Sequence, residues 1–522
     1  MVHHKTIALV TLSPNSHRTA EENLGIGYLA SALRKNNYSV VIIDGWLEGL
    51  TKKEVLEKIC GDPHIYIVGV SCYMSNNDDS IKLAKSIRKK RPDIKLICGG
   101  FGPSFHPEKF VGKEAFDVAM IGEGEESIIE VCDALFYNKA LYHINNIVFF
   151  EHNVVYKTQK GTQILNLDSL AFPARDTMMI SFHRKSTINV LTSRGCKGNC
   201  LFCSVNAFWK LTKGKKWRGR SITNIVDELE QLYQLGIRHV KFVDDSFIDG
   251  NRDALWAKEF YLELQRRNIR MNFRGSIRAD LVTDELIKYL KKAGFSSFAC
   301  GIENGSSTAL KRMNKSAILE SNHKALDIFK KYHILVQAGY ILFDDKTTFE
   351  EIKENYVFLK KHDEIVMKGI FSEMFAASGT LFTQKLEREN KIKQIEIYEN
   401  YRYEIADEKV RLLYLFFKRW HKNHMEIYDK IVDPISTPKA ISNLEAQEFY
   451  DIYLQIKRVD MSFMKMMIDF VESGMTQEEI ETAFIVYENQ TEPVYMKANI
   501  EADKIYARIG LTYDAKANPF IS

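Results

Sequence analysis

The sequence predicts an α/β protein with three parts: an N-terminal doubly wound, Rossmann-like domain, a central partial (β/α)6 TIM-like barrel and a C-terminal helical domain. Continuous Val, Ile and Leu runs alternate with helical segments through residues 5–135, and the alternation resumes at residue 188. Glycine and proline thin out after about residue 385. Unbroken apolar strands are typical of parallel sheets that helices cover on both faces. The predicted boundaries are 1–139, a connector at 140–187, 188–385 and 386–522.

The composition predicts a globular protein and gives no sign of a nucleic-acid-binding or membrane protein. The chain has 522 residues, of which 45% are hydrophobic, so it can bury more than one core. Its net charge of +4 is small beside 72 basic and 68 acidic residues, which gives no reason to expect nucleic acid or a membrane surface as partner. The N-terminus MVHHKTIALVTLS lacks the apolar stretch of a signal peptide, and no long apolar run follows. We therefore expect a cytoplasmic protein.

Glycines mark the ends of two strands in the N-terminal domain. The predicted strands are KTIALVTL, SVVIID, IYIVGVSCY, IKLICGG and DVAMIGEGE. The carboxyl edge of a doubly wound sheet is where such folds bind ligands, and glycine there leaves room for a wide one. The glycines concerned are Gly99, Gly100, Gly102, Gly122 and Gly124.

The barrel prediction starts after the connector, which contains the short strands NIVFFEHN and VVYKTQK and the loop LDSLAFPARD. Six strands follow, each beside a helical stretch: INVLTSR, HVKFVDDSF, MNFRGSIRAD, SSFACGIENGS, LVQAGYILFD and EIVMKGIFSEMFA. In barrels of this kind the working groups come from the carboxyl ends of the strands.

Three of the eight cysteines stand just past the first of these strand ends, in SRGCKGNCLFCSV. Cys196, Cys200 and Cys203 have C-x3-C-x2-C spacing, and glycines between them let three sulfurs converge. Structural zinc takes four ligands, and no fourth donor is nearby. A four-iron cluster held by three thiolates keeps one iron open for a substrate or cofactor. The remaining cysteines are predicted to be buried and structural; they are Cys60, Cys72, Cys98, Cys132 and Cys300.

The cysteine loop resembles the signature of the radical S-adenosylmethionine (SAM) superfamily, because strand, loop, spacing and the aromatic Phe202 before the last cysteine all agree. The resemblance implies that Cys196, Cys200 and Cys203 hold a 4Fe–4S cluster whose open iron binds SAM. The reduced cluster would cleave SAM to a 5′-deoxyadenosyl radical that takes a hydrogen atom from a small-molecule substrate. An external electron donor such as flavodoxin or ferredoxin would reduce the cluster.

The resemblance also implies residues that hold SAM. Carboxylates in FVDDSF would receive the ammonium group of the methionine moiety, although a helix N-cap is an alternative. Glu303 would contact the ribose, and Lys315 would pair with the carboxylate of SAM, although Lys315 equally suits a solvated surface. The full set is Phe202, Asp244, Asp245, Ser276, Arg278, Glu303, Lys315 and Gly339.

The N-terminal segments TAEENLGIGYLASALRKNNYSVVIID, VGVSCYMSN, ICGGFGPS and AMIGEGEES resemble the cobalamin-binding domain of cobalamin-dependent radical SAM enzymes. The resemblance covers roughly residues 5–345 and fails beyond about 390. One departure is that no D-x-H-x-x-G motif supplies a histidine to cobalt, since His17 and His106 lie in other contexts. The implied cobalamin contacts are Ser71, Tyr73, Met74, Gly99, Gly100, Phe101, Gly102, Gly122, Glu123, Gly124 and Glu125.

The leading functional hypothesis is a C-methyltransferase that acts at an unactivated carbon of a small-molecule or natural-product substrate. Rearrangement, cyclisation or oxidation without methyl transfer is the alternative, and the motifs would look the same. Less favoured are a methylthiotransferase, with a second cluster on Cys60, Cys72 and Cys98, and a non-enzymatic sensor. The helical domain is expected to cap the barrel and select substrate. The basic stretch from Lys210 to Arg220 is interpreted as a solvated loop, with attraction of an anionic substrate as the alternative.

Overall fold

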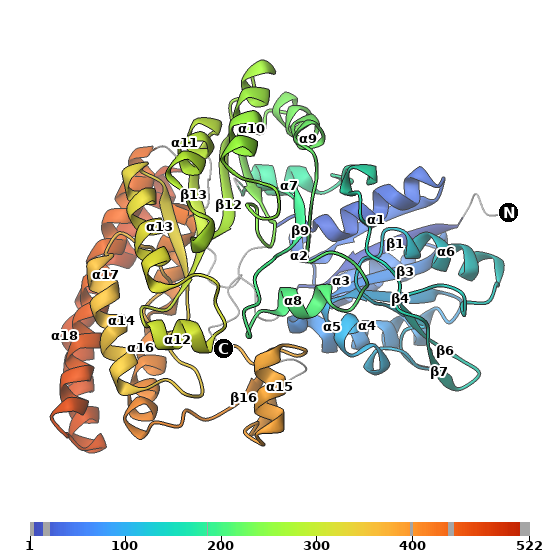
Figure 1. Ribbon diagram of the computed structural model, residues 1–522. Coiled ribbons are helices and arrows are strands. Elements are labelled where there is room, and N and C mark those ends of the chain that lie inside the picture. Colours follow the sequence, from blue (N-terminus) through green and yellow to red (C-terminus); the bar gives the residue numbers. More distant parts are fainter. Residues whose placement is uncertain (1–4, 14–20, 185, 397–399, 437–442, 512–522) are drawn as a thin grey trace.

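The computed structural model describes residues 5–13, 21–184, 186–396, 400–436 and 443–511. Two parallel sheets lie side by side, and the long C-terminal helices lie on the far side of the second sheet from the first (Figure 1). This arrangement confirms the predicted fold class. None of the described helices combines the length and apolarity needed to cross a membrane.

The first sheet has seven strands in the order β2-β1-β3-β4-β5-β6-β7. The first five are parallel, while β6 and β7 add an antiparallel edge. The order of the parallel part is that of the flavodoxin-like doubly wound sheet. Its strands are β1 (Thr6–Thr11), β2 (Ser39–Asp44), β3 (Ile65–Cys72), β4 (Lys95–Gly100), β5 (Val118–Met120), β6 (Ile147–Glu151) and β7 (Val154–Lys157).

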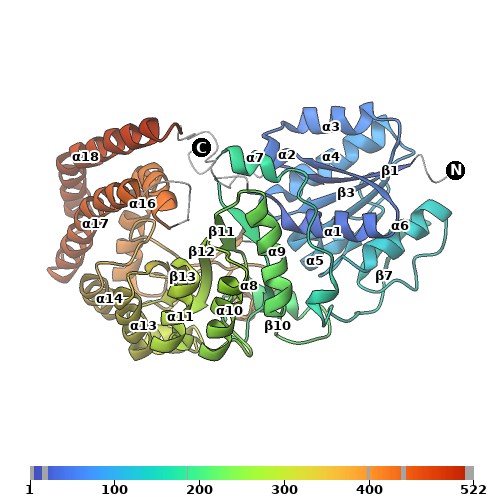
Figure 2. The ribbon, with the colours of Figure 1, turned by 90° about the horizontal axis from the view of Figure 1, so that it is seen from above.

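Helices cover both faces of this sheet (Figure 2). One face packs against α1 (Leu24–Lys35) and α6 (Ser127–Tyr137), the other against α3 (Lys52–Gly61) and α4 (Asn77–Lys90). This two-sided burial explains why the strands are continuously apolar. The short helices are α2 (Gly45–Glu48) and α5 (Phe101–Phe105), with 3-10 turns at Met74–Asn76 and Pro107–Lys109.

The connector lies against α1. The Ala174 amide donates to the Gly27 carbonyl at 3.0 Å, and Arg34 pairs with Asp176 at 2.6 Å. A Cβ on Gly27 would come within 2.8 Å of the Ala174 oxygen, so the close approach needs glycine. The connector also contains a 3-10 turn at Leu167–Ser169 and helix α7 (Met178–His183).

The second sheet is parallel, in the order β14-β13-β12-β11-β8. The predicted sixth strand touches this sheet only through isolated parallel bridges, Gln337 with Val366 and Phe343 with Glu373. Its backbone is partly bonded elsewhere, since the Met367 amide donates to the Tyr453 hydroxyl on a C-terminal helix at 2.9 Å. The strands are β8 (Ile188–Val190), β11 (His239–Phe242), β12 (Asn272–Arg278), β13 (Phe295–Glu303) and β14 (Leu335–Tyr340).

The helices of this part lie outside the sheet and share one core with it. The antiparallel strands β9 (Ser193–Gly195) and β10 (Trp217–Gly219) stand before and after the first helix, and the 3-10 turn Ala279–Leu281 follows β12. The helices are α8 (Ser204–Trp209), α9 (Ile222–Gln234), α10 (Ala254–Arg266), α11 (Asp284–Ala293), α12 (Ser307–Arg312), α13 (Leu319–Lys331) and α14 (Phe349–Lys361).

The C-terminal part is helical, as predicted, and is joined to the barrel by α15 (Leu381–Arg388) and the hairpin β15 (Gln394–Glu396) and β16 (Asn400–Arg402). Its long helices are α16 (Glu408–Ser436), α17 (Asn443–Glu472) and α18 (Gln477–Arg508). Buried side chains of all three belong to the same apolar cluster as the barrel strands. The helices therefore close the open side of the partial barrel.

Candidate functional site

The cysteine loop is anchored where β9 meets β10. Gly195 has φ +90°, and a Cβ there would lie 2.0 Å from the Lys216 carbonyl oxygen, so this position requires glycine. Its amide donates to the Asp245 carboxylate at 2.8 Å. Further along, the Leu201 amide donates to the Met313 carbonyl at 3.0 Å. Hydrogen bonds to neighbouring segments therefore hold the loop both just before Cys196 and between Cys200 and Cys203.

The three cysteines are half-buried and close enough to influence one another's ionisation. Burial raises the pKa of each thiol, that of Cys203 to about 11. Backbone amides oppose this: the Gly198 amide points at the Cys196 sulfur at 3.4 Å, and two amides at the start of α8 face Cys203. Amide donors of this kind favour thiolates. Within the described ranges, no group of His, Cys, Asp or Glu side chains is arranged to hold a single metal ion.

Arg278, at the end of β12, lies beside the cysteine loop, and its predicted contact with SAM stays a prediction. It pairs with Asp249 at 3.2 Å and with Asp280 at 2.6 Å, and its side chain approaches Gly198. Asp249 also accepts from the Lys197 amide at 2.9 Å. Arg278 therefore holds the cluster loop through a shared carboxylate and places a cation next to Cys196.

The two predicted SAM carboxylates after β11 have different surroundings. Asp244 is 4% exposed and accepts from the Thr192 amide at 2.6 Å and from the hydroxyls of Thr192 and Ser193, beside Arg252 at 3.5 Å. Asp245 accepts from Gly195 and from the indole of Trp209. Ser276 donates to the Asp244 carbonyl at 2.7 Å. All these groups support the cysteine loop, and a direct contact with SAM stays a prediction.

The remaining predicted SAM residues meet at the ends of β13 and β14. Lys315 and Glu303 form a buried ion pair at 2.8 Å. Burial alone would lower the pKa of Lys315, but Glu303 raises it, and the nearby Cys200 acts in the same direction. A Cβ on Gly301 would lie 2.5 Å from the Glu303 carboxylate, while Gly339 faces the same carboxylate. Phe202 packs against the apolar cluster that contains Met313.

On the first sheet, a cavity of about 210 Å³ opens at the carboxyl edge of β1, β3, β4 and β5. Gly69, Gly99 and Gly124 line it together with apolar side chains of α1 and α6. A Cβ on Gly99 would meet only the Met120 Cβ, at 3.7 Å, so a larger side chain there would extend into the cavity. The glycines leave gaps between the side chains of this edge, so it can receive one face of a large planar ligand, most of which would lie outside a cavity of this size.

Helix α8 connects the two sites. It begins directly after Cys203, and its last residues, Phe208 and Trp209, line the cavity of the first sheet. Phe208 also packs on Phe101 with ring centroids 4.7 Å apart, and the Trp209 indole donates to Asp245. The cysteine loop and the glycine-lined cavity are therefore separated by only one short helix.

A family model described as the B12 binding domain matches residues 17–131, and one described as the radical SAM superfamily matches residues 190–359. Together they cover more than half of the 522 residues, and each contains one of the two sites. The chain is a radical SAM enzyme with an N-terminal B12-binding domain. Its cofactors are accordingly cobalamin, SAM and a 4Fe–4S cluster, as the resemblance implied.

Individual relatives agree with this family. An uncharacterized methyltransferase of Pyrococcus horikoshii is 29% identical over 346 residues, which are 65% of this chain and 73% of the relative. An anaerobic magnesium-protoporphyrin IX monomethyl ester cyclase of Synechocystis is 26% identical over 339 residues, which are 63% of this chain and 65% of the relative. The structure of the cobalamin-dependent SAM radical enzyme OxsB, with aqua-cobalamin and SAM bound, superposes with a TM-score of 0.78 at 19% identity. The alignment covers 99% of this chain and 82% of OxsB, and this likeness shows a shared fold.

The two glutamates implied to contact cobalamin join the two domains of the enzyme through ion pairs. Arg194, just before the cysteine loop, pairs with both Glu123 and Glu125 at 2.5 Å. Arg218 pairs with Glu123 at 2.8 Å. Arg218 and Arg220 are buried, so their interpretation as part of a solvated loop is wrong. Arg218 binds Glu123 of the first domain, and Arg220 binds Glu228 on α9. A contact of Glu123 or Glu125 with cobalamin stays a prediction.

The other predicted cobalamin positions surround the same edge. Gly100 has φ +106° and closely approaches Cys72, whereas Gly102 packs on the Asn77 side chain and does not face open space. Ser71 and Gly122 line the cavity, and Met74 begins a 3-10 turn. The Tyr73 hydroxyl accepts from the Asn23 amide at 2.9 Å. His17 lies outside the described residues, and His106 hydrogen-bonds to Ser378 at 3.0 Å.

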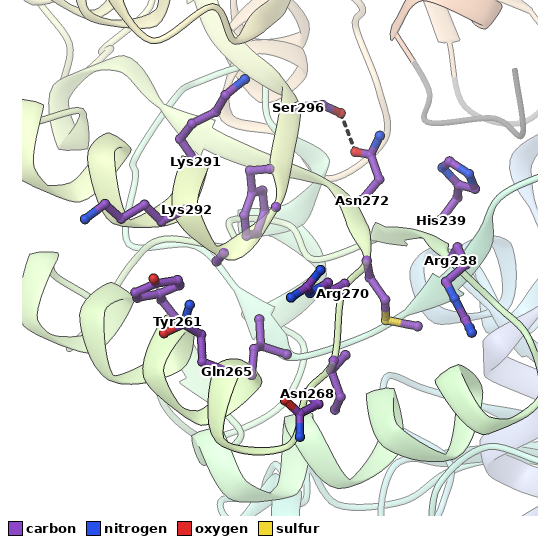
Figure 3. A pocket seen from close by; sticks show the side chains of 16 residues that line it. Arg238, His239, Tyr261, Gln265, Asn268, Arg270, Asn272, Lys291, Lys292 and Ser296 are labelled. Carbon is purple, nitrogen blue, oxygen red and sulfur yellow. Dashed lines mark hydrogen bonds between the residues drawn. The ribbon is translucent and has the colours of Figure 1, made fainter. Parts of the chain in front are cut away.

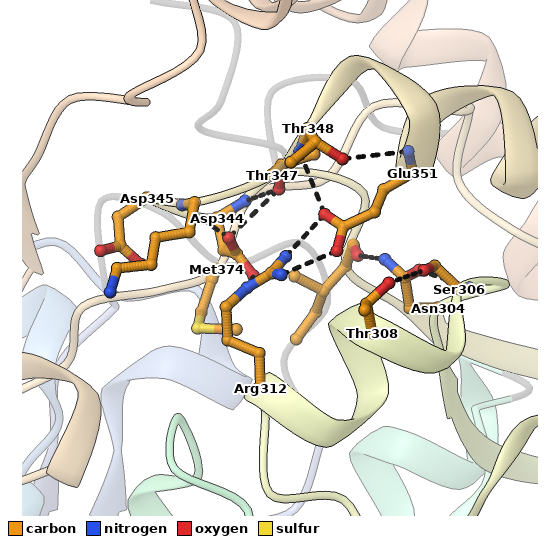
Figure 4. A network of polar contacts seen from close by, with 12 residues as sticks. Asn304, Ser306, Thr308, Arg312, Asp344, Asp345, Thr347, Thr348, Glu351 and Met374 are labelled. Atoms are coloured by element: carbon orange, nitrogen blue, oxygen red, sulfur yellow. Dashed lines mark hydrogen bonds and ion pairs between the residues drawn. The ribbon is translucent and has the colours of Figure 1, made fainter.

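Sequence reasoning missed the polar network behind Glu303 (Figure 4). Arg312 on α12 pairs with Asp344 at 3.0 Å and with Glu351 at 2.7 Å. Asn304 donates to the Ile341 carbonyl and accepts from Asn355, which fixes the turn in which Glu303 has φ +65°. A non-glycine residue in this conformation is held there by its surroundings. The signal available in the sequence was an acidic residue at the end of the fifth predicted strand, Asp344.

A larger cavity, of about 880 Å³, lies at the opposite end of the barrel strands (Figure 3). Arg238, Arg270, Lys291 and Lys292 are among the residues that line it. It opens at the amino ends of β11, β12 and β13, away from the cysteines and the glycine-lined cavity. Its position therefore excludes it from the site that the two cofactors define.

Proposed function

We propose that the enzyme transfers a methyl group to an unactivated carbon of a small-molecule substrate. The observation that carries this proposal is helix α8, which begins at Cys203 and ends in the wall of the glycine-lined cavity. When bound, SAM at the cluster supplies a hydrogen-abstracting radical and cobalamin supplies a methyl group. One substrate carbon must meet both, and the two sites share one short helix.

The residues of this chain have positioning roles in the proposal. Cys196, Cys200 and Cys203 would hold the cluster, with Arg278 beside the first thiolate. The Glu303–Lys315 pair offers one acceptor and one cation for the ribose and the carboxylate of SAM. The glycines of β3, β4 and the turn after β5 leave space for cobalamin.

The printed name of the Pyrococcus horikoshii relative, a methyltransferase, supports this proposal. The Synechocystis relative, a cyclase, favours a second candidate, in which the same cofactors drive cyclisation or another rearrangement without methyl transfer. Both candidates use the same residues, so only the product distinguishes them.

The test uses SAM with a deuterated methyl group and a strong chemical reductant, with candidate substrates offered to the reconstituted full-length enzyme under anaerobic conditions. We expect 5′-deoxyadenosine and a product that carries the labelled methyl group. A substrate-dependent product without label would contradict methyl transfer and favour the second candidate. Absence of 5′-deoxyadenosine from cluster-loaded enzyme would contradict both.

An external donor such as flavodoxin or ferredoxin is proposed to supply the electron, in the cytoplasm. A pocket of about 250 Å³ reaches Cys200 and Cys203 from outside, and exposed Lys210 lies on its wall. Together with exposed Lys197 and Lys215, this lysine gives the surface a charge that suits an acidic donor. Reduction by flavodoxin should slow as salt rises, whereas reduction by dithionite should not follow the same salt dependence.

A further inference from the structure

One transverse layer inside the barrel is polar. Asn189, Lys241, Arg274 and Ser297 stand opposite one another in register on the adjacent strands β8, β11, β12 and β13. Their chain neighbours, such as Val240 and Phe273, belong to the apolar core shared with the helices, so the four point the other way. Barrel interiors are ordinarily filled by bulky apolar side chains. A layer of this composition is adapted to a polar ligand.

Arg274 is a buried cation in this layer. It is 8% exposed and donates to the Gln337 side chain and to the Ser436 carbonyl at the end of α16. Burial lowers the pKa of Arg274 to about 10. Within the part of the chain that the structure describes, no carboxylate forms an ion pair with it. Asp433 and Glu21 lie near enough to raise the pKa of Arg274, but neither contacts the guanidinium. The buried charge is therefore only partly compensated, and an anion bound directly against it would complete the site.

Lys241 is paired, but with a carboxylate from the other domain. Glu21, which precedes α1, contacts Lys241 at 2.8 Å and accepts from the Asn189 amide at 3.0 Å. The side chains of Lys241 and Glu21 are 28% and 25% exposed, so solvent reaches the pair. Asn189 keeps a buried carbonyl oxygen that no described group satisfies. Glu21 thus brings a carboxylate from the cobalamin domain to the layer that contains Arg274.

We propose that the substrate carries an anionic group, a carboxylate or a phosphoryl group, which Arg274 and Lys241 bind inside the barrel. This inference rests on the proposed function, since it names the substrate class of that reaction. Glu21 competes with the anion for Lys241. When substrate is absent, the Glu21 carboxylate pairs with Lys241 where the anion would bind. The polar layer disfavours a hydrocarbon substrate, because such a molecule would leave Arg274 and Asn189 without partners.

Anion binding can be measured without knowing the substrate. Inorganic phosphate and acetate are titrated separately, at constant ionic strength with chloride, into full-length enzyme loaded with its cofactors, and the melting temperature is followed. We expect a saturable rise with at least one of them. Phosphate acting alone would indicate a phosphoryl group, and acetate acting alone a carboxylate.

Substitutions of the two cations and of Glu21 should change the affinity for phosphate or acetate in opposite directions. Arg274→Gln and Lys241→Gln should each weaken anion binding by about tenfold or more, since a buried charge contact is lost. Glu21→Gln should strengthen it, because the competing carboxylate is gone. Lys291→Gln, in the separate cavity of Figure 3 at the amino ends of the strands, is the matched control and should change nothing.

Three outcomes would overturn the inference: no saturable effect of either anion, an effect that Lys291→Gln removes, or an effect that Arg274→Gln and Lys241→Gln both leave intact. If Arg274→Gln fails to fold, Arg274→Lys keeps the charge and should retain binding, and Lys241→Gln then decides. The two proposals can be contradicted independently. Wild-type enzyme that binds the anion but gives no labelled product would contradict methyl transfer and leave the anion site standing.

Discussion

The carboxyl edges of the two parallel sheets are built in opposite ways. The edge of the cobalamin domain is open, with glycines in β3, β4 and the turn after β5 lining a cavity of about 210 Å³. The edge of the barrel is filled with paired charges, among them Arg278 with Asp249 and Lys315 with Glu303. The first provides space, and the second provides fixed polar side chains.

The difference follows from what each cofactor brings. Cobalamin is large and preformed, so the protein need only leave room and a shape. The cluster and SAM are small and depend on thiolates, a cation and a carboxylate held at set positions. Buried ion pairs and the positive-φ turn at Glu303 hold those groups, at an energetic cost that the surrounding packing offsets. Each edge should therefore fail independently when altered.

The largest effect is expected from Cys200→Ser. Loss of one thiolate should remove the cluster, so iron content and 5′-deoxyadenosine formation should fall to background, while cobalamin binding persists. The measurements are iron analysis, absorbance of the cluster and chromatography of SAM products. Cys60→Ser, on α3 of the other domain, is the control and should keep both cofactors. Loss of cobalamin together with the cluster would show that the edges are coupled.

The converse variant is Gly99→Val. Its Cβ meets only Met120, at 3.7 Å, so the fold should tolerate it, but the side chain should enter the cavity. We expect cobalamin content to fall by about tenfold or more, while iron content and the rate of SAM cleavage remain at wild-type levels. Gly112→Val, where a Cβ meets nothing within 4 Å, is the matched control. Normal cobalamin content in Gly99→Val would mean that the cavity does not receive the cofactor.

The two edges meet at Arg194, which gives the next prediction. Arg194→Gln removes the ion-pair partner of buried Glu125, which keeps only the weaker influence of Arg218, and should lower the free energy of unfolding by about 3 kcal/mol at neutral pH. Burial pushes the pKa of Glu125 up, but Arg194 more than offsets it, so the pKa lies below its ordinary value.

The pH dependence of Arg194→Gln follows from this shift. In the wild type, the stability that Glu125 contributes is present at neutral pH and is lost as the pH falls through its lowered pKa. In the variant, burial raises the pKa of Glu125, so protonation relieves the penalty. The difference in stability between the two should therefore shrink as the pH falls from 7 toward about 5. Urea denaturation at each pH measures it, and a constant difference would contradict the assignment.

The fold could be predicted from the sequence because it rests on local patterns, and the cluster ligands, which stay a prediction, were inferred from a local pattern too. Apolar runs indicated the parallel sheets, and Cys196, Cys200 and Cys203 are adjacent in the chain. The sixth predicted barrel strand pairs with β14 and the residues after it only in short stretches, and between these the Met367 amide donates to Tyr453, which lies far away in the sequence. No local pattern could show that.

The same limit applies to charged residues. Glu123 and Glu125 stand in a turn that suits a ligand contact, yet their partners, Arg194 and Arg218, come from the next domain. The polar layer of Lys241 and Arg274 alternates with apolar residues as any half-buried strand does. Only the register between strands shows that these side chains face one another.

The smallest predicted effect is that of Tyr73→Phe, at a residue implied to contact cobalamin. Its hydroxyl accepts from Asn23 inside the domain, and its ring packs against Trp46 at 6.0 Å. Losing this hydrogen bond should lower the free energy of unfolding by about 1 kcal/mol. The absorption spectrum of bound cobalamin should not change. We expect this edge to accommodate cobalamin by leaving room for it, and not by providing a side chain that ligates cobalt. A shifted cobalamin spectrum in Tyr73→Phe would indicate that Tyr73 ligates cobalt. The edge of the cobalamin domain would then resemble that of the barrel, which binds its cofactors through fixed side chains.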